Sequence, residues 1–122
     1  MSADDFDALV DEAWKNLPEA FKSQLRNVEI VIEDWPDAHT LHLARIRNPL
    51  SLLGFYHGVP LTERGLGYHM VTPDKISLYR EPIMQSCPDR EHLGEAIAHV
   101  LRHEIAHHFG ISDARLHELG AY

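Results

Sequence analysis

A long helical pattern in the C-terminal third of this sequence constrains its fold more than any other feature. The pattern runs from Pro88 to about Phe109, and Gly110 follows as the left-handed residue that commonly ends a helix. A last short helix is predicted over residues 113–119. The C-terminal third of the chain is therefore expected to be helical.

The N-terminal segment has a helical pattern as well. From Asp4 to about Leu17, apolar residues recur at three- and four-residue spacing, as on one face of an amphipathic helix. Pro18 is expected to open a second, short helix, because proline suits a first helical turn. Two helices are thus predicted before any strand.

Short segments between these helices have the patterns of strands. Residues 28–32 are rich in β-branched side chains, and residues 52–57 lead into a Gly- and Pro-containing turn. Residues 75–80 alternate apolar and polar side chains, and Glu81-Pro82 is expected to close this third strand. The pattern over residues 38–49 is ambiguous.

The predicted elements occur in blocks, without the regular strand-helix alternation of a parallel wound sheet. We therefore predict an α+β fold with N-terminal helices, a small mixed sheet of about three strands and a long C-terminal helix. The 122 residues fit one domain over 1–122, since single cores commonly hold roughly 50 to 200 residues. A hydrophobic content of 44% is that of a globular chain that folds by itself.

Charge and cysteine content limit the possible partners and ligands. Lys and Arg total 11 against 19 Asp and Glu, so the formal charge of −8 repels polyanions and no nucleic-acid partner is expected. No run reaches membrane-spanning length and the acidic N-terminus lacks a secretory signal, so we expect no membrane contact and a cytoplasmic location. Cys87 is the only cysteine, so any metal must be held by histidines and carboxylates. The oligomeric state stays open.

The motif H-E-x-x-H lies within the predicted long helix and is followed by G-x-x-D. His103 and His107 are four residues apart, on one helix face and about 6 Å apart along the axis, so both can reach one cation. Glu104 is rotated by about 100° and can act as a base beside the metal. Gly110 can turn the chain so that Asp113 becomes a third ligand, with the fourth position open. This pattern predicts a zinc site with Glu104 as the catalytic residue.

Other histidines leave alternatives open. His99, one turn before His103, could close a structural zinc site, but we expect it to be a core or carboxylate-oriented histidine. His108 points toward the apolar side of the helix and is expected to pack there. His117 is a weaker candidate for the third ligand than Asp113.

At H-E-I-A-H-H-F-G-I-S-D the sequence resembles the zincin superfamily, and specifically the small bacterial minimal metalloproteases of about this length. The block 54–64 and the strand 76–80 resemble that family too, so the resemblance covers roughly residues 50–120. It implies a compact sheet with an active-site helix behind it. The site residues that it implies are the ligands His103, His107 and Asp113 and the catalytic base Glu104.

The favoured function is zinc-dependent hydrolysis of a peptide or protein substrate, with Glu104 taking the proton from water. The peptide could add to an exposed edge, for which the strand 75–80 is the candidate. The residues Tyr68, His69 and Tyr79 could stabilise the oxyanion, although each more commonly packs or lies on the surface.

Two alternatives come from different classes of protein. A metal-dependent endoribonuclease would share the spacing H-x3-H-x5-D/H, but the bacterial ribosomal-RNA-processing family has glycine at the position of Glu104. Its RNA would also need a basic surface. A non-enzymatic zinc-binding interaction module would not need a base beside its ligands. The presence of Glu104 therefore favours chemistry.

Overall fold

The computed structural model describes residues 3–17, 19–22, 25, 28–58, 74–87 and 89–110, and every structural statement below concerns these residues. In chain order the elements are α1 (Ala3–Lys15), α2 (Glu19–Lys22), β1 (Val28–Glu33), α3 (Ala38–Ala44), the 3₁₀ helix η1 (Pro49–Ser51), β2 (Gly54–His57), β3 (Asp74–Tyr79), α4 (Arg80–Ser86) and α5 (Arg90–His108). The α+β class is thereby confirmed. The predicted helix over 113–119 lies outside the described residues.

The three strands form one mixed sheet in the order β1-β3-β2. β1 runs parallel to β3, with Ile30 opposite Ile76, and β2 runs antiparallel to it, with Phe55 opposite Ser77. β3 is therefore the central strand, and five of its six residues are buried. The expectation that residues 75–80 offer an exposed edge to a peptide is wrong, because both sides of that strand are already paired.

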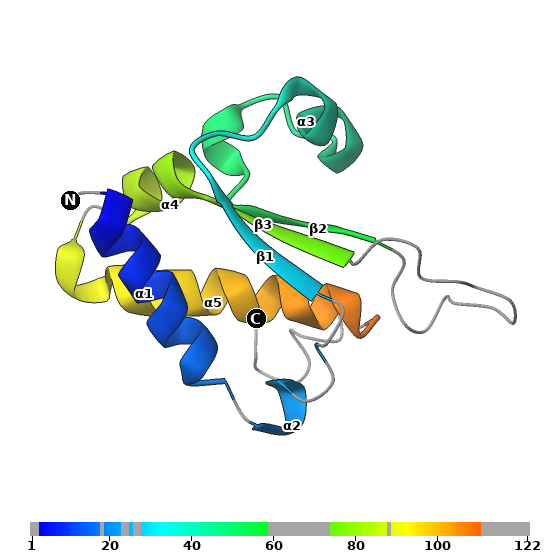
Figure 1. Ribbon diagram of the computed structural model, residues 1–122. Coiled ribbons are helices and arrows are strands. Elements are labelled where there is room, and N and C mark those ends of the chain that lie inside the picture. Colours follow the sequence, from blue (N-terminus) through cyan, green and yellow to red (C-terminus); the bar gives the residue numbers. More distant parts are fainter. Residues whose placement is uncertain are drawn as a thin grey trace, which may run out of the picture.

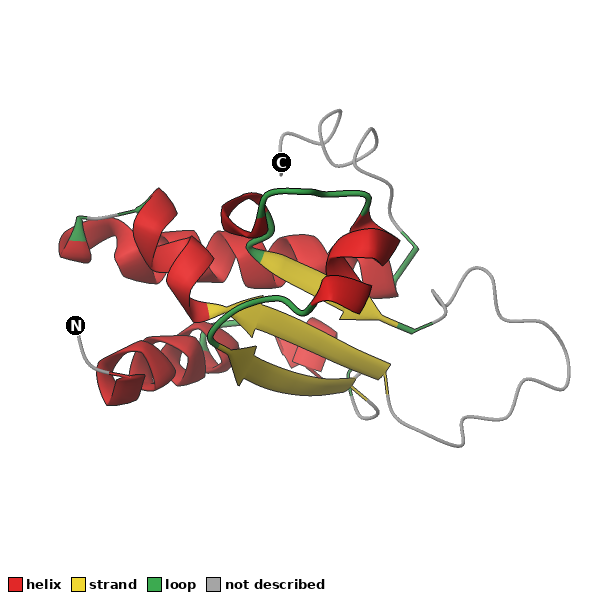
Figure 2. Cartoon of the chain, turned by 90° about the horizontal axis from the view of Figure 1, so that it is seen from above, coloured by secondary structure: helices red, strands yellow, loops and turns green. Residues whose placement is uncertain are grey.

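Helices α1 and α5 cover one side of the sheet, and α3 lies on the other side (Figures 1 and 2). Because α1 and α5 are both amphipathic, their apolar stripes meet each other and the inner face of β3. The core between them is formed by Phe6, Val10, Ile76, Leu78, Ile97, Leu101 and Ile105. The long helix is thus held against the sheet by apolar packing along most of its length.

One local prediction needs correction, and the structure assigns the region that was ambiguous in sequence. The third strand ends at Tyr79, and Glu81-Pro82 belongs to the first turn of α4 rather than to a closing loop. Proline is tolerated there because a first-turn N–H has no helical acceptor. The ambiguous region 38–49 contains α3 and the start of η1, and α3 is capped by Asp37, which accepts a 2.7 Å hydrogen bond from the Thr40 N–H.

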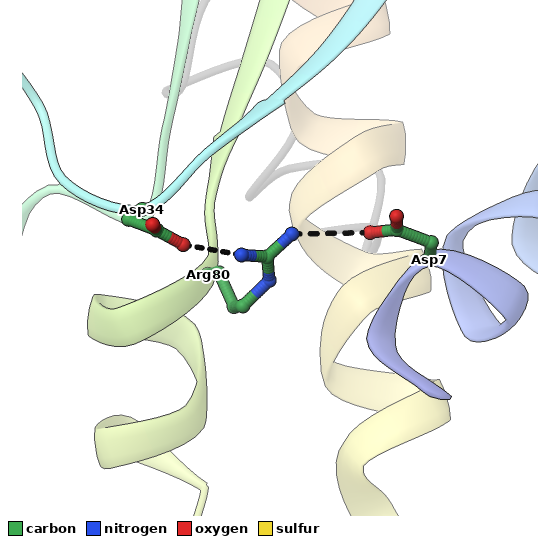
Figure 3. A network of polar contacts seen from close by, with 3 residues as sticks. All are labelled: Asp7, Asp34 and Arg80. Carbon is green, nitrogen blue, oxygen red and sulfur yellow. Dashed lines mark hydrogen bonds and ion pairs between the residues drawn. The ribbon is translucent and has the colours of Figure 1, made fainter. Parts of the chain in front are cut away.

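Arg80 joins three parts of the fold at the start of α4 (Figure 3). Its guanidinium donates to the carboxylates of Asp34, after β1, and of Asp7, on α1. It also lies over the ring of Phe6, at 5.6 Å from the ring centroid. These contacts fasten α1 and α4 to the sheet at the end remote from the last turn of α5.

None of the described helices combines the length and the apolar composition that a membrane crossing requires.

Candidate metal centre

Helix α5 carries the H-E-x-x-H motif, and its position follows from local sequence signals. Asp89 caps its start by accepting a 3.0 Å hydrogen bond from the Glu91 N–H. Apolar residues four positions apart form its buried stripe: Leu93, Ile97, Leu101 and Ile105. At its end, Gly110 has a φ of 80° and its N–H donates to the His107 carbonyl at 2.9 Å. The predicted left-handed glycine stop is therefore confirmed.

The side chains of His103, Glu104 and His107 come together near the C-terminal end of α5. The potential ligand atoms of the three residues lie within 4.8 Å of one another. The rings of His103 and His107 meet edge to face, with centroids 4.6 Å apart and planes at 70°. This arrangement could hold a metal ion, as the four-residue spacing on one helix face leads us to expect.

Glu104 is buried while the two histidines are partly exposed. The exposed fraction of its side chain is 8%, against 32% for His107. Its Oε1 lies 3.2 Å from Nδ1 of His107. An ionised carboxylate oxygen only accepts, so a hydrogen bond here requires the ring proton on Nδ1, which would leave Nε2 as the nitrogen able to bind a metal.

Gly54, the first residue of β2, allows α5 to approach the sheet closely at this point. A Cβ atom at Gly54 would lie 2.8 Å from Cγ1 of Val100, 3.1 Å from the carbonyl oxygen of Ser77 and 3.3 Å from Cγ of Glu104. Any larger residue would therefore have to displace the helix or its side chains. The burial of Glu104 depends on this close approach.

A cavity of about 340 Å³ adjoins two of these three side chains, those of His103 and Glu104. Its apolar wall is formed by Ile46, Leu52, Leu53 and Val100, and His103 and Glu104 lie on its polar side. The volume is within the range of small-molecule sites, in which apolar walls surround a few polar groups. An apolar group held here would lie beside the candidate metal-binding residues.

His99 also lines this cavity but is exposed on α5. Its ring centroid is 6.5 Å from that of His103, and it does not belong to the close group of potential ligand atoms. The expectation of a core histidine is therefore wrong for His99.

His108 is buried as expected, but it takes part in a polar network instead of a purely apolar contact. Its Nδ1 lies 2.9 Å from Oδ2 of Asp74, and the Tyr56 hydroxyl donates to the same oxygen at 2.6 Å. His108 and Asp74 are each only 3% exposed. This network was missed from the sequence, although the period-two spacing of Gly54 and Tyr56 indicates that both face α5.

Several candidate residues are not tested by this geometry. Asp113 and His117, the candidates for the third ligand, lie outside the described residues, as do Tyr68 and His69. Tyr79 is described and is only 1% exposed. Burial raises the pKa of its hydroxyl, against the lowering effect of hydrogen bonds with Ser77 and Thr40. Tyr79 therefore packs in the core and does not reach a substrate.

Comparison with known proteins identifies the class to which this fold and site belong. The model of the zincin-like metallopeptidase family matches residues 25–121. The chain belongs to this family, which confirms the resemblance seen in its motif. Together, the family and the group of His103, Glu104 and His107 indicate metal-dependent hydrolysis.

A solved structure has the same fold. A conserved hypothetical protein from Thermus thermophilus is similar with a TM-score of 0.60 and 22% sequence identity. The similarity covers 89% of this chain and 94% of that chain. At this identity the likeness shows the fold alone. No match was found among the curated proteins.

Proposed function

We propose that this protein is a zinc-dependent peptidase in which His103, His107 and Asp113 hold the metal and Glu104 is the general base. The observation that carries the proposal is the group of His103, Glu104 and His107, whose potential ligand atoms lie within 4.8 Å of one another on a helix packed against the sheet. The membership of this chain in the zincin-like metallopeptidase family agrees with hydrolytic chemistry. The substrate would be a peptide or a protein.

The donor set suits zinc. Two imidazoles and one carboxylate are typical ligands of catalytic zinc sites, which keep a fourth position open. The contact of His107 Nδ1 with Glu104 orients the ring and favours Nε2 as the ligand atom. When bound, zinc supplies polarisation of the scissile carbonyl and lowers the pKa of the attacking water.

Glu104 is suited to move the proton. Its carboxylate is buried beside His107 yet lies on the wall of the cavity, where a substrate would be bound. It would accept the proton of the attacking water and then deliver it to the nitrogen of the leaving amine. Its burial keeps bulk water from competing for that proton.

The sheet offers a place for the peptide at β2. Among the described strands, β2 has a neighbour on one side only, and its first residue, Gly54, contacts Glu104. An extended peptide that pairs with this edge would pass close to the base. The apolar wall of the adjoining cavity would then take an apolar side chain of the substrate.

Glu104→Gln tests the base assignment. Zinc content, measured by mass spectrometry of the metal, should stay at one ion per chain, while cleavage of a peptide library should fall by about 100- to 10,000-fold. Glu95→Gln is the matched control, because Glu95 is an exposed glutamate on the same helix and does not line this cavity. Equal cleavage by Glu104→Gln and the wild type would reject Glu104 as the base.

The same preparations distinguish the competing functions. Zinc binding without cleavage of any peptide would favour a non-enzymatic module. Salt-dependent RNA binding and cleavage would favour a nuclease, against the net charge of −8. Absence of zinc binding by the wild type would reject the proposal entirely.

A further inference from the structure

We propose that Gly54, Tyr56, Asp74 and His108 are positioning residues that set where α5 rests on the sheet and thereby hold the metal-binding side chains in place. We call these four residues the docking contacts. The inference rests on the proposed zinc site, and it adds a second role for the segment 54–58, whose strand β2 is also the proposed edge for the peptide.

Every second residue of the segment 54–58 lies on the same face of the strand and its extension. Side chains alternate across a strand, so Gly54 and Tyr56 share a face, and Gly58 continues the same spacing just beyond β2. Gly54 meets Val100 and Glu104 of α5. Tyr56 meets His108 of the same helix, with ring centroids 5.6 Å apart and planes at 72°. One face of this short strand therefore touches α5 at two levels.

The first level is the close approach of α5 to β2 at Gly54, which has no side chain. Only hydrogen occupies the space in which a Cβ atom at Gly54 would lie 2.8 Å from Val100 and 3.3 Å from Glu104. The third neighbour is the backbone carbonyl of Ser77 on β3, which cannot rotate away. The distance between α5 and the sheet is therefore set at the turn of helix that contains Glu104.

The second level is the buried network of His108, Asp74 and Tyr56. A buried carboxylate is costly unless it has partners, and Oδ2 of Asp74 has two, at 2.6 Å from the Tyr56 hydroxyl and at 2.9 Å from His108 Nδ1. Rotation or translation of α5 would separate His108 from Asp74. The network therefore fixes both the rotation and the axial position of the end of the helix.

Gly58 limits the freedom of this network from the other side. A Cβ atom at Gly58 would lie 2.6 Å from Cγ and Oδ1 of Asp74 and 2.8 Å from the Tyr56 hydroxyl oxygen. The backbone of Gly58 is thus packed directly against both partners of His108. Asp74 and Tyr56 can keep their positions only while a glycine stands there.

The two levels enclose the candidate metal-binding residues along the helix. Val100 precedes His103 by less than one turn, and His108 directly follows His107. Successive helical residues differ in direction by about 100°, so fixing His108 also fixes the direction of His107. Metal sites need their ligands held to within about 0.5 Å of the productive geometry. The docking contacts supply this restraint from the side of α5 that faces the sheet.

Tyr56→Phe and His108→Leu test the inference through zinc affinity, measured by competition with a chelator. Tyr56→Phe removes only the hydroxyl and keeps the ring, so it is expected to fold. We expect zinc affinity to fall about 10- to 100-fold in His108→Leu, the range for groups that orient metal ligands, and less in Tyr56→Phe. His108→Asn, which retains a donor near Nδ1, should recover part of the loss.

Arg80→Met is the matched control. Arg80 follows the end of β3 that lies opposite to Asp74, and its hydrogen bonds go to Asp7 and Asp34, so the substitution leaves the docking contacts untouched. It should lower stability and leave zinc affinity within about twofold of the wild type. Equal zinc affinities for the wild type, Tyr56→Phe and His108→Leu would overturn the inference while leaving the zinc site itself intact. A loss in Arg80→Met as large as in His108→Leu would overturn it too, because the effect would then be general destabilisation.

Hydrogen exchange of the metal-free protein gives a second readout that does not depend on zinc. Amides in the last two turns of α5 should exchange about tenfold faster in Tyr56→Phe than in the wild type, while amides of α1 change less. Uniform acceleration in both helices would contradict a local positioning role. Failure of the wild type to bind zinc would reject the proposed function, and the exchange rates would still decide whether these residues position α5.

Discussion

Replacing Arg80 by methionine removes a guanidinium that joins α1, the end of β1 and the start of α4 (Figure 3). The Arg80 side chain is 17% exposed, whereas its partners Asp7 and Asp34 are 51% and 63% exposed. The guanidinium also lies over Phe6, which is fully buried. Methionine keeps an apolar stem over this ring and removes only the charge and the hydrogen bonds.

The expected loss of stability is small because the contributions oppose one another. Each ion pair with a half-exposed carboxylate contributes about 0.5 kcal/mol, and the contact with the ring of Phe6 adds about 1 kcal/mol. Against this, Nε of Arg80 is buried without a hydrogen-bond partner among the described residues, and its removal recovers about 1 kcal/mol. Arg80→Met should therefore lower the free energy of unfolding by about 1 kcal/mol.

Arg80→Ala should cost more, because it also removes the stem that covers Phe6. We expect a loss of about 2 to 3 kcal/mol, measured by urea unfolding of the metal-free protein. The difference between the two variants reports the packing of the stem. An equal loss in both variants would refute this reasoning by showing that the stem does not stabilise the fold. A loss above about 4 kcal/mol in Arg80→Met would refute it by showing that the charge contributes far more than its exposure allows.

Further predictions concern the metal, the cavity and acid stability. Asp113→Ala should weaken zinc binding by more than about 100-fold in a chelator competition, and unchanged affinity would exclude Asp113 as a ligand. Ile46→Phe should narrow the cavity and shift cleavage about tenfold toward peptides with small apolar side chains. Leu43→Phe, on the exposed side of α3, should not shift cleavage. Identical cleavage profiles for Ile46→Phe and the wild type would contradict a substrate pocket. Burial, followed by the charge of Lys75, lowers the pKa of His57 from 6.5, so the unfolded chain takes up this proton first as the pH falls. The stability contributed by neutral His57 is present above about pH 6.5 and is lost as the pH falls through its lowered native pKa. The free energy of unfolding in urea should therefore fall less on acidification in His57→Gln than in the wild type. An equal fall in both proteins would argue against this contribution.

The elements that could be predicted from the sequence are those whose signals are local. The long helix shows its apolar spacing and its glycine stop within about twenty residues of chain, and Val28–Glu33 carries its β-branched composition in adjacent positions. The four-residue spacing of His103 and His107 places them on one helix face in any fold that keeps the helix. For this reason the helix with the candidate metal-binding residues and the α+β class were both predictable.

The order of the strands and the contacts behind α5 depended on the tertiary structure. The alternation of residues 75–80 indicates a strand but carries no information on its neighbours, and pairing with β1 and β2 on both sides makes it central. The assignment of Glu81-Pro82 to a helix depends likewise on how α4 packs, since Pro82 and Ile83 are buried. Propensity alone could not decide between a loop and a first helical turn there.

Within the candidate site, the spacing of residues along the helix was predictable from the sequence, whereas the contacts of the helix with the sheet were not. H-E-x-x-H by itself determined which side chains share one helix face, because helical geometry is local. Only the tertiary structure determined that His108 meets Asp74, which is 34 positions away in sequence, and that Gly54 admits the helix beside Glu104. Hydrogen bonds and close approaches of this kind join residues whose separation along the chain carries no periodic signal.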